Sequence, residues 1–265
     1  LVRDQGGPGN LAIEFRRLLL LTAGMLSTEA PTTMGNVLMS VAAKKSTRAS
    51  EHFDVLIVGA GISGIGAAYH LKQQTPGTTF VALESQDSFG GTWITHKYPG
   101  IRSDSDLHTF GYRFKPWVGP PIAAASEILR YMEEVIEENG LNPHIRYGHT
   151  ITKAEWSSAD NRWTITANRK SDGATLTFTC GFLWMCQGYY RHAQGYTPDW
   201  PGMSDFKGRI VHPQTWPEDL DYTGKRMIVI GSGATAATLI PAVAAKTSHV
   251  TMLQRSPTYF IPGRN

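Results

Sequence analysis

Residues 53–64 read FDVLIVGAGISG, and this stretch decides the fold. An apolar run of buried-strand length comes first, the glycine pattern G-x-G-x-x-G follows, and an alanine-rich helix is predicted to about Gln74. A second strand is predicted over residues 79–83 and ends at Glu84. Strand, glycine turn and helix in this order are typical of a unit that binds a dinucleotide.

Each residue type has a physical task in such a unit. Gly59 permits the tight turn, Gly61 lets the backbone approach a pyrophosphate, and Gly64 lets the helix pack closely on the strand. The N-terminus of the helix faces the phosphate charge. Glu84 stands where a carboxylate accepts hydrogen bonds from a ribose diol. The glycine pattern alone also occurs in ordinary turns, but strand, helix and acidic residue in register favour a nucleotide site.

A second unit of the same kind lies further along the chain. A strand at 227–230 runs into GSGATA at 231–236, an alanine-rich helix follows, and a strand is predicted at 249–253. Arg255 stands where a carboxylate would select a free 2′-hydroxyl, and a guanidinium suits a 2′-phosphate. We therefore expect the first unit to bind a dinucleotide without that phosphate and the second to bind NADPH. The alternative is that Arg255 is a solvated surface residue.

Composition narrows the class of protein. The chain has 265 residues, 41% hydrophobic and 18% charged with a net charge of +3, which is typical of a soluble globular protein of one or two domains. The chain has no long run of like charges of the kind that binds nucleic acid, and its cysteines have no spacing typical of a metal site. Cys180 and Cys186 fit a reducing compartment and cannot pair without a bend, which disfavours a flavin disulfide reductase. We expect a cytoplasmic protein with at most peripheral membrane contact.

The segment between the two units predicts a small antiparallel β-meander inserted in an α/β frame. An amphipathic helix is expected at 126–139, with Ser126 as its N-cap and Gly140 at its end. Strands are expected at 145–156, 162–167, 175–180 and 182–186.

Residues 1–51 differ in character from the rest. Their apolar run at 18–26 is about half of the ~20 residues that a membrane span needs. A signal peptide is an alternative, but the cleavage pattern after Leu26 is poor. We interpret this segment as a disordered or non-native extension before a later start such as Met34 or Met39.

Two further segments carry long motifs. Residues 90–104 read GGTWITHKYPGIRSD, a loop whose Gly, Pro, Trp, Tyr, Arg and Asp suit a flat, partly charged ring. Residues 206–217 read FKGRIVHPQTWP and precede the second nucleotide unit. Each segment taken alone is equally consistent with an irregular loop that carries structural aromatic residues.

Together these features resemble the flavin-dependent class B monooxygenases of the Baeyer–Villiger type. Residues 90–104 match the family pattern [A/G]-G-x-W-x4-[F/Y]-P-[G/M]-x3-D, and residues 206–217 match F-x-G-x3-H-x3-W-[P/D]. The resemblance implies a flavoprotein with two Rossmann-like domains. They are an FAD-binding domain at 52–188 and an NADPH-binding domain at 218–265, both incomplete, with a linker at 189–217 between them.

The resemblance also implies roles for individual residues. Asp104 is implied to lie near the flavin and to orient a catalytic arginine that the family supplies from beyond the NADPH unit. Arg102 and Ser103 are implied to face the nicotinamide. His212 and Trp216 are implied to couple the two domains without touching the substrate. Asp104, Arg102 and His212 are thus the catalytic candidates. The implied FAD-binding residues are Gly59, Gly61, Ser63, Gly64, Glu84, Thr92, Trp93, Asp104 and the backbone near Ile151. The implied NADPH-binding residues are Arg102, Ser103, Gly231, Ser232, Gly233, Thr235, Ala236, Arg255 and Ser256.

The implied activity inserts one oxygen atom from O2 into a ketone, giving an ester or lactone, or oxidises soft sulfur, with FAD and NADPH as cofactors. In the family the chain continues past the NADPH unit and supplies the catalytic Arg, whereas 11 residues follow Gln254 here. We therefore expect a truncated chain. A catalytically inactive product that at most binds nucleotide is the alternative. A flavin reductase or oxidase is a third, against which the motif at 206–217 argues.

Overall fold

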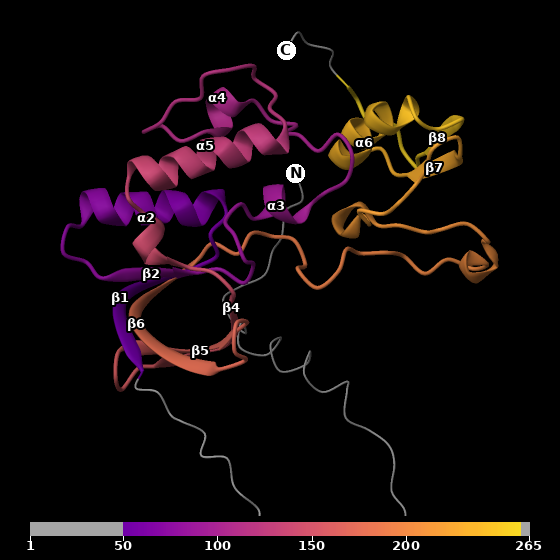
Figure 1. Cartoon of the computed structure of the whole chain (residues 1–265). Coiled ribbons are helices and arrows are strands. Elements are labelled where there is room, and N and C mark those ends of the chain that lie inside the picture. Colours follow the sequence, from indigo (N-terminus) through magenta and orange to yellow (C-terminus); the bar gives the residue numbers. More distant parts are fainter. Residues whose placement is uncertain (1–49, 261–265) are drawn as a thin grey trace, which may run out of the picture. The chain divides into compact units, whose positions relative to one another are not determined.

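The computed structural model describes residues 50–260 (Figure 1). The expected extension at 1–51 therefore lies outside the described residues, except that Glu51 already belongs to the first strand. The strands are β1 (Glu51–Val58), β2 (Phe80–Leu83), β3 (Ile145–Arg146), β4 (His149–Ser157), β5 (Arg162–Arg169), β6 (Thr175–Met185), β7 (Arg226–Ile230) and β8 (His249–Leu253). The helices are α2 (Ile62–Gln74), α3 (Thr92–Thr95), α4 (Leu107–Phe110), α5 (Ala125–Glu138) and α6 (Ala234–Ala244), with 3-10 turns at Asn142–His144, Met203–Asp205 and Pro213–Thr215.

The larger sheet has six strands in the order β3-β2-β1-β6-β5-β4. Strand β1 pairs in parallel with β2 on one side and β6 on the other, and β2 pairs in parallel with β3. Strands β4, β5 and β6 form an antiparallel meander. The expected combination of a parallel Rossmann-like core and a small β-meander is confirmed.

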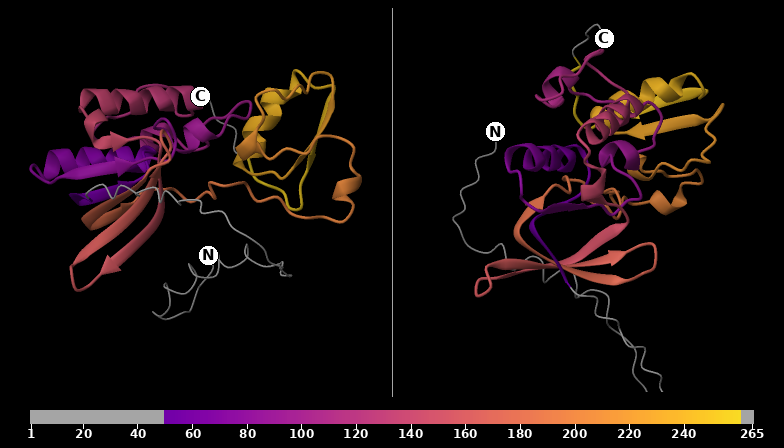
Figure 2. Two further views of the ribbon diagram at one scale, coloured as in Figure 1. Left: turned by 60° about the horizontal axis from the view of Figure 1, so that its bottom comes forward. Right: turned by 60° about the vertical axis from the view of Figure 1, so that its left-hand side comes forward.

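Alternation along β1 divides the core of this sheet into two faces, because successive side chains of a strand point to opposite sides. Val55 and Ile57 pack with apolar residues of α2 and α5. Leu56 packs on the other face with Ile165 of β5 and Phe178 of β6. Helices α2 and α5 therefore cover one face while the meander curls under the other (Figures 1 and 2).

Two boundaries between the units differ from the sequence expectation. The predicted strand at 145–156 is two strands, because Gly148 adopts a φ of +65° between β3 and β4. The predicted strands at 175–180 and 182–186 are one strand, β6, which pairs with β5 over residues 175–180 and with β1 over residues 178–185. A local pattern cannot show which strands lie on either side of a strand or how far each pairing extends.

Helix α5 spans Ala125–Glu138 instead of the expected 126–139, and its N-cap lies two residues before the expected one. Its N-cap is Ala124 and not Ser126, which lies in the first turn. The side chain of Glu127 accepts a hydrogen bond of 2.8 Å from the backbone N–H of Ala124 and so stabilises this end of the helix. The expected apolar face is confirmed, since Ile128 and Met132 are fully buried.

Strands β7 and β8 form a separate parallel pair, joined by α6. This confirms the second strand, glycine turn, helix and strand. Met227, Val229 and Val250 pack against α6. The side chains of Ile228 and Ile230, which alternate with them, are 61% and 57% exposed, so the face of this pair that lies away from α6 is open.

Both cysteines are free, as expected from their spacing, and both are buried. Burial raises the pKa of Cys180 to about 11 and also raises that of Cys186, which makes both thiols poor nucleophiles. Within residues 50–260, no helix combines the length and the apolar character that a bilayer crossing requires.

The packing of α2 on its own turn makes Gly64 a test of the fold. A Cβ on Gly64 would lie 2.0 Å from the carbonyl oxygen of Gly59, so Gly64→Ala is expected to lower the free energy of unfolding by about 3 kcal/mol. Denaturant unfolding measures this change. Ser63→Ala, at an exposed position of the same turn of helix, serves as the control. Equal stability of the two variants would contradict this packing.

Candidate functional site

The first glycine turn is closed by two hydrogen bonds to the backbone of one residue, Ala60. The N–H of Ala60 donates to Oε2 of Glu84 at 2.7 Å, and the carbonyl of Ala60 accepts from the N–H of Gly90 at 3.0 Å. Gly59 adopts a φ of +97°, and a Cβ there would lie 2.9 Å from the carbonyl oxygen of Cys186. The turn that joins β1 to α2 is therefore held between the end of β2 and the loop that begins at Gly90.

Glu84 is a buried carboxylate at the point where several segments meet. It is 6% exposed, and its Oε1 accepts a hydrogen bond of 2.8 Å from the N–H of Gln86. Its own N–H donates to the carbonyl of Arg146, and its carbonyl accepts from the N–H of His149. A buried charge is stable only when it is well hydrogen-bonded, so the side chain is fixed beside the glycine turn.

The loop at 90–104 begins directly against the first turn. Gly91 contacts Gly61, whose added Cβ would lie 3.6 Å from the Cα of Gly91. Gly90 has a φ of +126°, which favours glycine. The short helix α3 follows and places Thr92 and Trp93, both half-buried, immediately after this contact. The structure thus brings these two predicted flavin-binding residues to the glycine turn.

His96 is a residue of this loop to which the sequence interpretation gave no role. It is buried, and its Nδ1 lies 3.1 Å from the carbonyl oxygen of Thr92, so the ring caps α3. Its ring centroid lies 5.0 Å from that of Tyr190. Burial lowers the pKa of His96, and the nearby His212 lowers it further. The only signal in the sequence is that a histidine stands inside the long motif.

The end of the loop carries the three charged or polar residues predicted to serve the flavin and the nicotinamide. Arg102 and Asp104 are exposed. Ser103 is buried instead, and its hydroxyl accepts a hydrogen bond of 3.1 Å from the N–H of Ala123. The Ser103 side chain thus holds the loop against the neighbouring segment, and its expected role at the nicotinamide stays a prediction.

The pKa of Tyr190 is raised in part by charged and titratable residues of this loop. A hydrogen bond with Tyr189 and burial, followed by nearby groups that include Tyr98 and Asp104, raise the pKa of Tyr190 to about 12. Tyr190, which follows β6 and whose ring lies 5.0 Å from that of His96, therefore lies beside the loop that bears the catalytic candidate Asp104.

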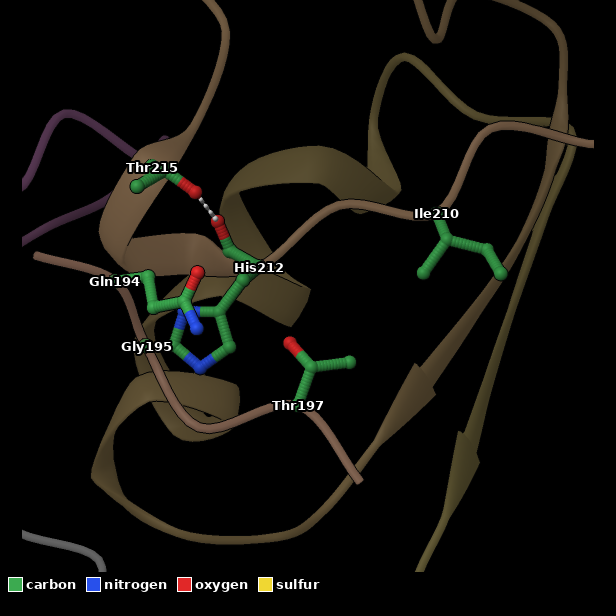
Figure 3. Close-up of a pocket in the computed structure, with 6 residues that line it drawn as sticks. All are labelled: Gln194, Gly195, Thr197, Ile210, His212 and Thr215. Atoms are coloured by element: carbon green, nitrogen blue, oxygen red, sulfur yellow. Dashed lines mark hydrogen bonds between the residues drawn. The ribbon is translucent and has the colours of Figure 1, made fainter. Parts of the chain in front are cut away.

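His212 lines a pocket of about 330 Å³ in the segment between β6 and β7 (Figure 3). Its ring lies directly against the backbone of Gly195, where an added Cβ would be 2.0 Å from Cε1 of the ring. Its Nδ1 accepts a hydrogen bond of 3.1 Å from the N–H of Gln214. This packing fits a positioning residue, and the coupling role stays a prediction. The pocket is lined by Gln194, Gly195, Thr197, Ile210, His212 and Thr215.

The second glycine turn is open. Among residues 50–260, no atom outside the adjoining residues lies within 4 Å of an added Cβ at Gly231 or Gly233, and Gly231 has a φ of +115°. The hydroxyl of Ser232 lies 2.7 Å from that of Thr258, which ties this turn to the chain after β8. Arg255 is exposed in that same segment.

The remaining predicted NADPH residues follow the turn into α6 or the end of β8. Ala236 is buried in the position of the third glycine, Thr235 is half-buried and Ser256 is exposed.

These features fit dinucleotides better than metals. The first N–H groups of a helix have no partner within it, and α2 and α6 present them beside glycine turns. The buried Glu84 supplies the acceptor that a ribose requires. Ile151, expected near the adenine, is half-buried on β4 where the pairing with β5 is irregular. No cluster of three or more metal-ligating side chains occurs within residues 50–260.

Comparison with known proteins agrees with this geometry. Residues 116–264 match the flavin-binding monooxygenase-like family, and residues 57–118 match the NAD(P)-binding Rossmann-like domain. The FAD-containing monooxygenase EthA of Mycolicibacterium smegmatis is 56% identical over 212 residues, which are 79% of this chain and 43% of EthA.

Two solved structures are similar as well. Cyclohexanone monooxygenase from Rhodococcus sp. Phi1 bound to NADP+ superposes with a TM-score of 0.68 at 30% identity, covering 81% of this chain and 40% of that one. An oxidized steroid monooxygenase bound to NADP has a TM-score of 0.68 at 34% identity, covering 80% and 40%.

The chain belongs to the flavin-binding monooxygenase-like family. This confirms the resemblance that the motifs at 90–104 and 206–217 indicate. The chain spans less than half the length of the relatives that it matches, 43% in the case of EthA.

The buried His96 makes stability depend on pH. Because its pKa in the folded chain lies below the ordinary 6.5, the unfolded chain takes up a proton first as the pH falls, and stability is lost below that value. His96→Gln is expected to reduce the loss of unfolding free energy between about pH 7.5 and about pH 5. The exposed His108, changed to Gln, is the control, and an unchanged pH dependence in the His96 variant would contradict the assignment.

Proposed function

We propose that the chain binds FAD at the first glycine turn and NADPH at the second. We further propose that it serves a monooxygenase that inserts an oxygen atom from O2 into a ketone or oxidises soft sulfur. The observation that carries the proposal is the arrangement around Ala60. Its N–H donates to the Glu84 carboxylate, and its carbonyl accepts from the N–H of Gly90. This joins a pyrophosphate site, a ribose acceptor and the motif loop in one place.

For FAD, the chain offers three groups in sequence along the ligand. Glu84 holds the ribose, the N-terminus of α2 faces the pyrophosphate, and Thr92 with Trp93 lies beside the flavin ring. The close contact of Gly91 with Gly61 supports this order, because it brings the start of the motif loop to the turn. The name of the relative EthA as an FAD-containing protein supports the choice of flavin.

For NADPH, the chain offers the open turn at Gly231 and Gly233 and the cation Arg255. The space above these glycines lets a pyrophosphate approach the backbone. The exposed guanidinium of Arg255 pairs with a 2′-phosphate. Both solved structures reported above hold NADP, which supports this choice of dinucleotide.

FAD, when bound, supplies the transfer of electrons and the activation of O2. The residues of the chain bind and orient the two cofactors and exclude water from them. The Asp104 carboxylate is exposed and suits a cationic partner, and Arg102, two residues earlier in the sequence, is exposed as well. His212 holds the segment at 190–197 in place through its contact with Gly195.

The second candidate function is dinucleotide binding without oxygenation. The exposure of Arg102 and Asp104 favours it, because oxygen chemistry requires a site from which water is excluded. The two candidate functions share both cofactor sites and differ only in whether a substrate is oxygenated.

Two matched glycine substitutions test the cofactor sites. Gly61 and Gly233 have φ values of −76° and −77°, so alanine fits the backbone at both. Gly61→Ala is expected to weaken FAD binding about tenfold while leaving NADP+ binding unchanged, because its methyl occupies the approach of the pyrophosphate. Gly233→Ala is expected to do the reverse. Fluorescence titration with each dinucleotide alone measures both effects, and identical affinities in all three proteins would contradict the assignment.

Oxygen labelling separates the two candidate functions. The chain is supplied with FAD, NADPH and labelled O2, and with a cyclic ketone or a thioether as the probe. Monooxygenation predicts one labelled oxygen atom in the ester or sulfoxide, detected by mass spectrometry, and a lower yield of this product in the Gly61→Ala variant at an FAD concentration that does not saturate it. Bound cofactors without labelled product would select the binding function.

A further inference from the structure

The loop at 90–104, which begins at the proposed FAD site, packs directly on helix α6, which begins at the proposed NADPH site. We propose that Tyr98, Pro99 and Gly100 form a coupling segment, through which occupation of one dinucleotide site raises the affinity of the other. This rests on the proposed binding of FAD and NADPH. No ligand contact is assigned to the segment, so its residues are positioning residues.

Tyr98 fixes the coupling segment to α6 by burial. Its ring is 7% exposed and packs with Leu239 and Val243 in one hydrophobic cluster. Its hydroxyl lies 3.4 Å from the hydroxyl of Thr238. A residue of the flavin-binding motif thus belongs to the core of the NADPH unit, and moving it exposes apolar surface of that core.

Gly100 makes the contact too close for any other residue. An added Cβ would lie 2.5 Å from the carbonyl oxygen of Thr238 and 2.6 Å from the Cβ of Ala242. Its φ of +78° also favours glycine. The backbone of the loop therefore lies directly on the surface of α6, and a displacement of either one displaces the other. An exposed ion pair between Lys97 and Glu218 adds to the contact only weakly.

A short route connects this contact to both sites. Towards FAD, the loop begins at Gly90, whose N–H holds the carbonyl of Ala60 in the first turn. Towards NADPH, Thr238 lies in α6, whose N-cap is Gly233 of the second turn. A dinucleotide that orders one end of this route lowers the cost of ordering the other end. The resulting coupling is positive, and linkage makes it equal in both directions.

The test is the dissociation constant of FAD with and without saturating NADP+, measured on the full chain by fluorescence titration. The unmodified chain is expected to bind FAD about fivefold more tightly when NADP+ is present, the lower end of ordinary coupling between sites. Gly100→Ala is expected to bring this ratio to about one. Gly77→Ala is the matched control, since Gly77 also has a positive φ of +95° but its added Cβ has no neighbouring atom within 4 Å in the part of the chain that the structure describes.

Tyr98→Leu is a second variant, which keeps an apolar side chain in the cluster but removes the ring and its hydroxyl. Circular dichroism selects the variants that fold, and a lost ratio in either folded variant, with the ratio kept in Gly77→Ala, supports the proposal. A ratio of one in the unmodified chain, or a ratio that both folded variants retain, overturns it. Failure of the unmodified chain to bind either dinucleotide overturns the proposed function, and the coupling falls with it.

Discussion

The backbone of Ala60, held at both its N–H and its carbonyl, is the constraint on which the first nucleotide site depends. Its N–H points at the carboxylate of Glu84 and its carbonyl at the N–H of Gly90, so the turn cannot move without breaking a bond to a buried charge. Hydrogen bonds to a charged group contribute about 1.5 to 3 kcal/mol each. Loss of the donor would also leave the carboxylate of Glu84 less well satisfied at a buried position.

The same carboxylate explains why the sheet and the site form together. The backbone of Glu84 pairs with Arg146 before the meander and with His149 at its first strand, while its side chain reaches the glycine turn. Strand β2, the start of the meander and the turn are therefore fixed relative to one another by one residue. A cofactor site that forms in this way is preorganised, which reduces the ordering cost of binding.

Much of this could be predicted from the sequence because its determinants are local. The apolar run before Gly59, the spacing to Gly64 and the acid at Glu84 fix a strand, turn and helix within a short stretch, and the same holds for the unit at 226–253. The assignment of Gly64 to close packing is confirmed, since its added Cβ would meet the carbonyl of Gly59. The two long motifs indicated the family correctly.

What the sequence could not show depends on contacts between distant segments. The burial of Ser103 accompanies its hydrogen bond with Ala123. The pairing of β6 with β5 stops at Cys180 because the partner of Cys180 is already the second residue of β5. The packing of Gly100 on α6 joins residues that are far apart in the chain. No periodicity or spacing encodes these contacts, because each requires the position of a second segment in space.

The most direct measurement of the central claim is a crystal structure of the chain grown with FAD. The account predicts that the pyrophosphate lies against the N–H groups at the start of α2, that Glu84 accepts hydrogen bonds from the ribose, and that the hydrogen bonds of Ala60 to Glu84 and Gly90 persist. FAD bound at the second turn, or a Glu84 side chain turned away from the ribose, would contradict it.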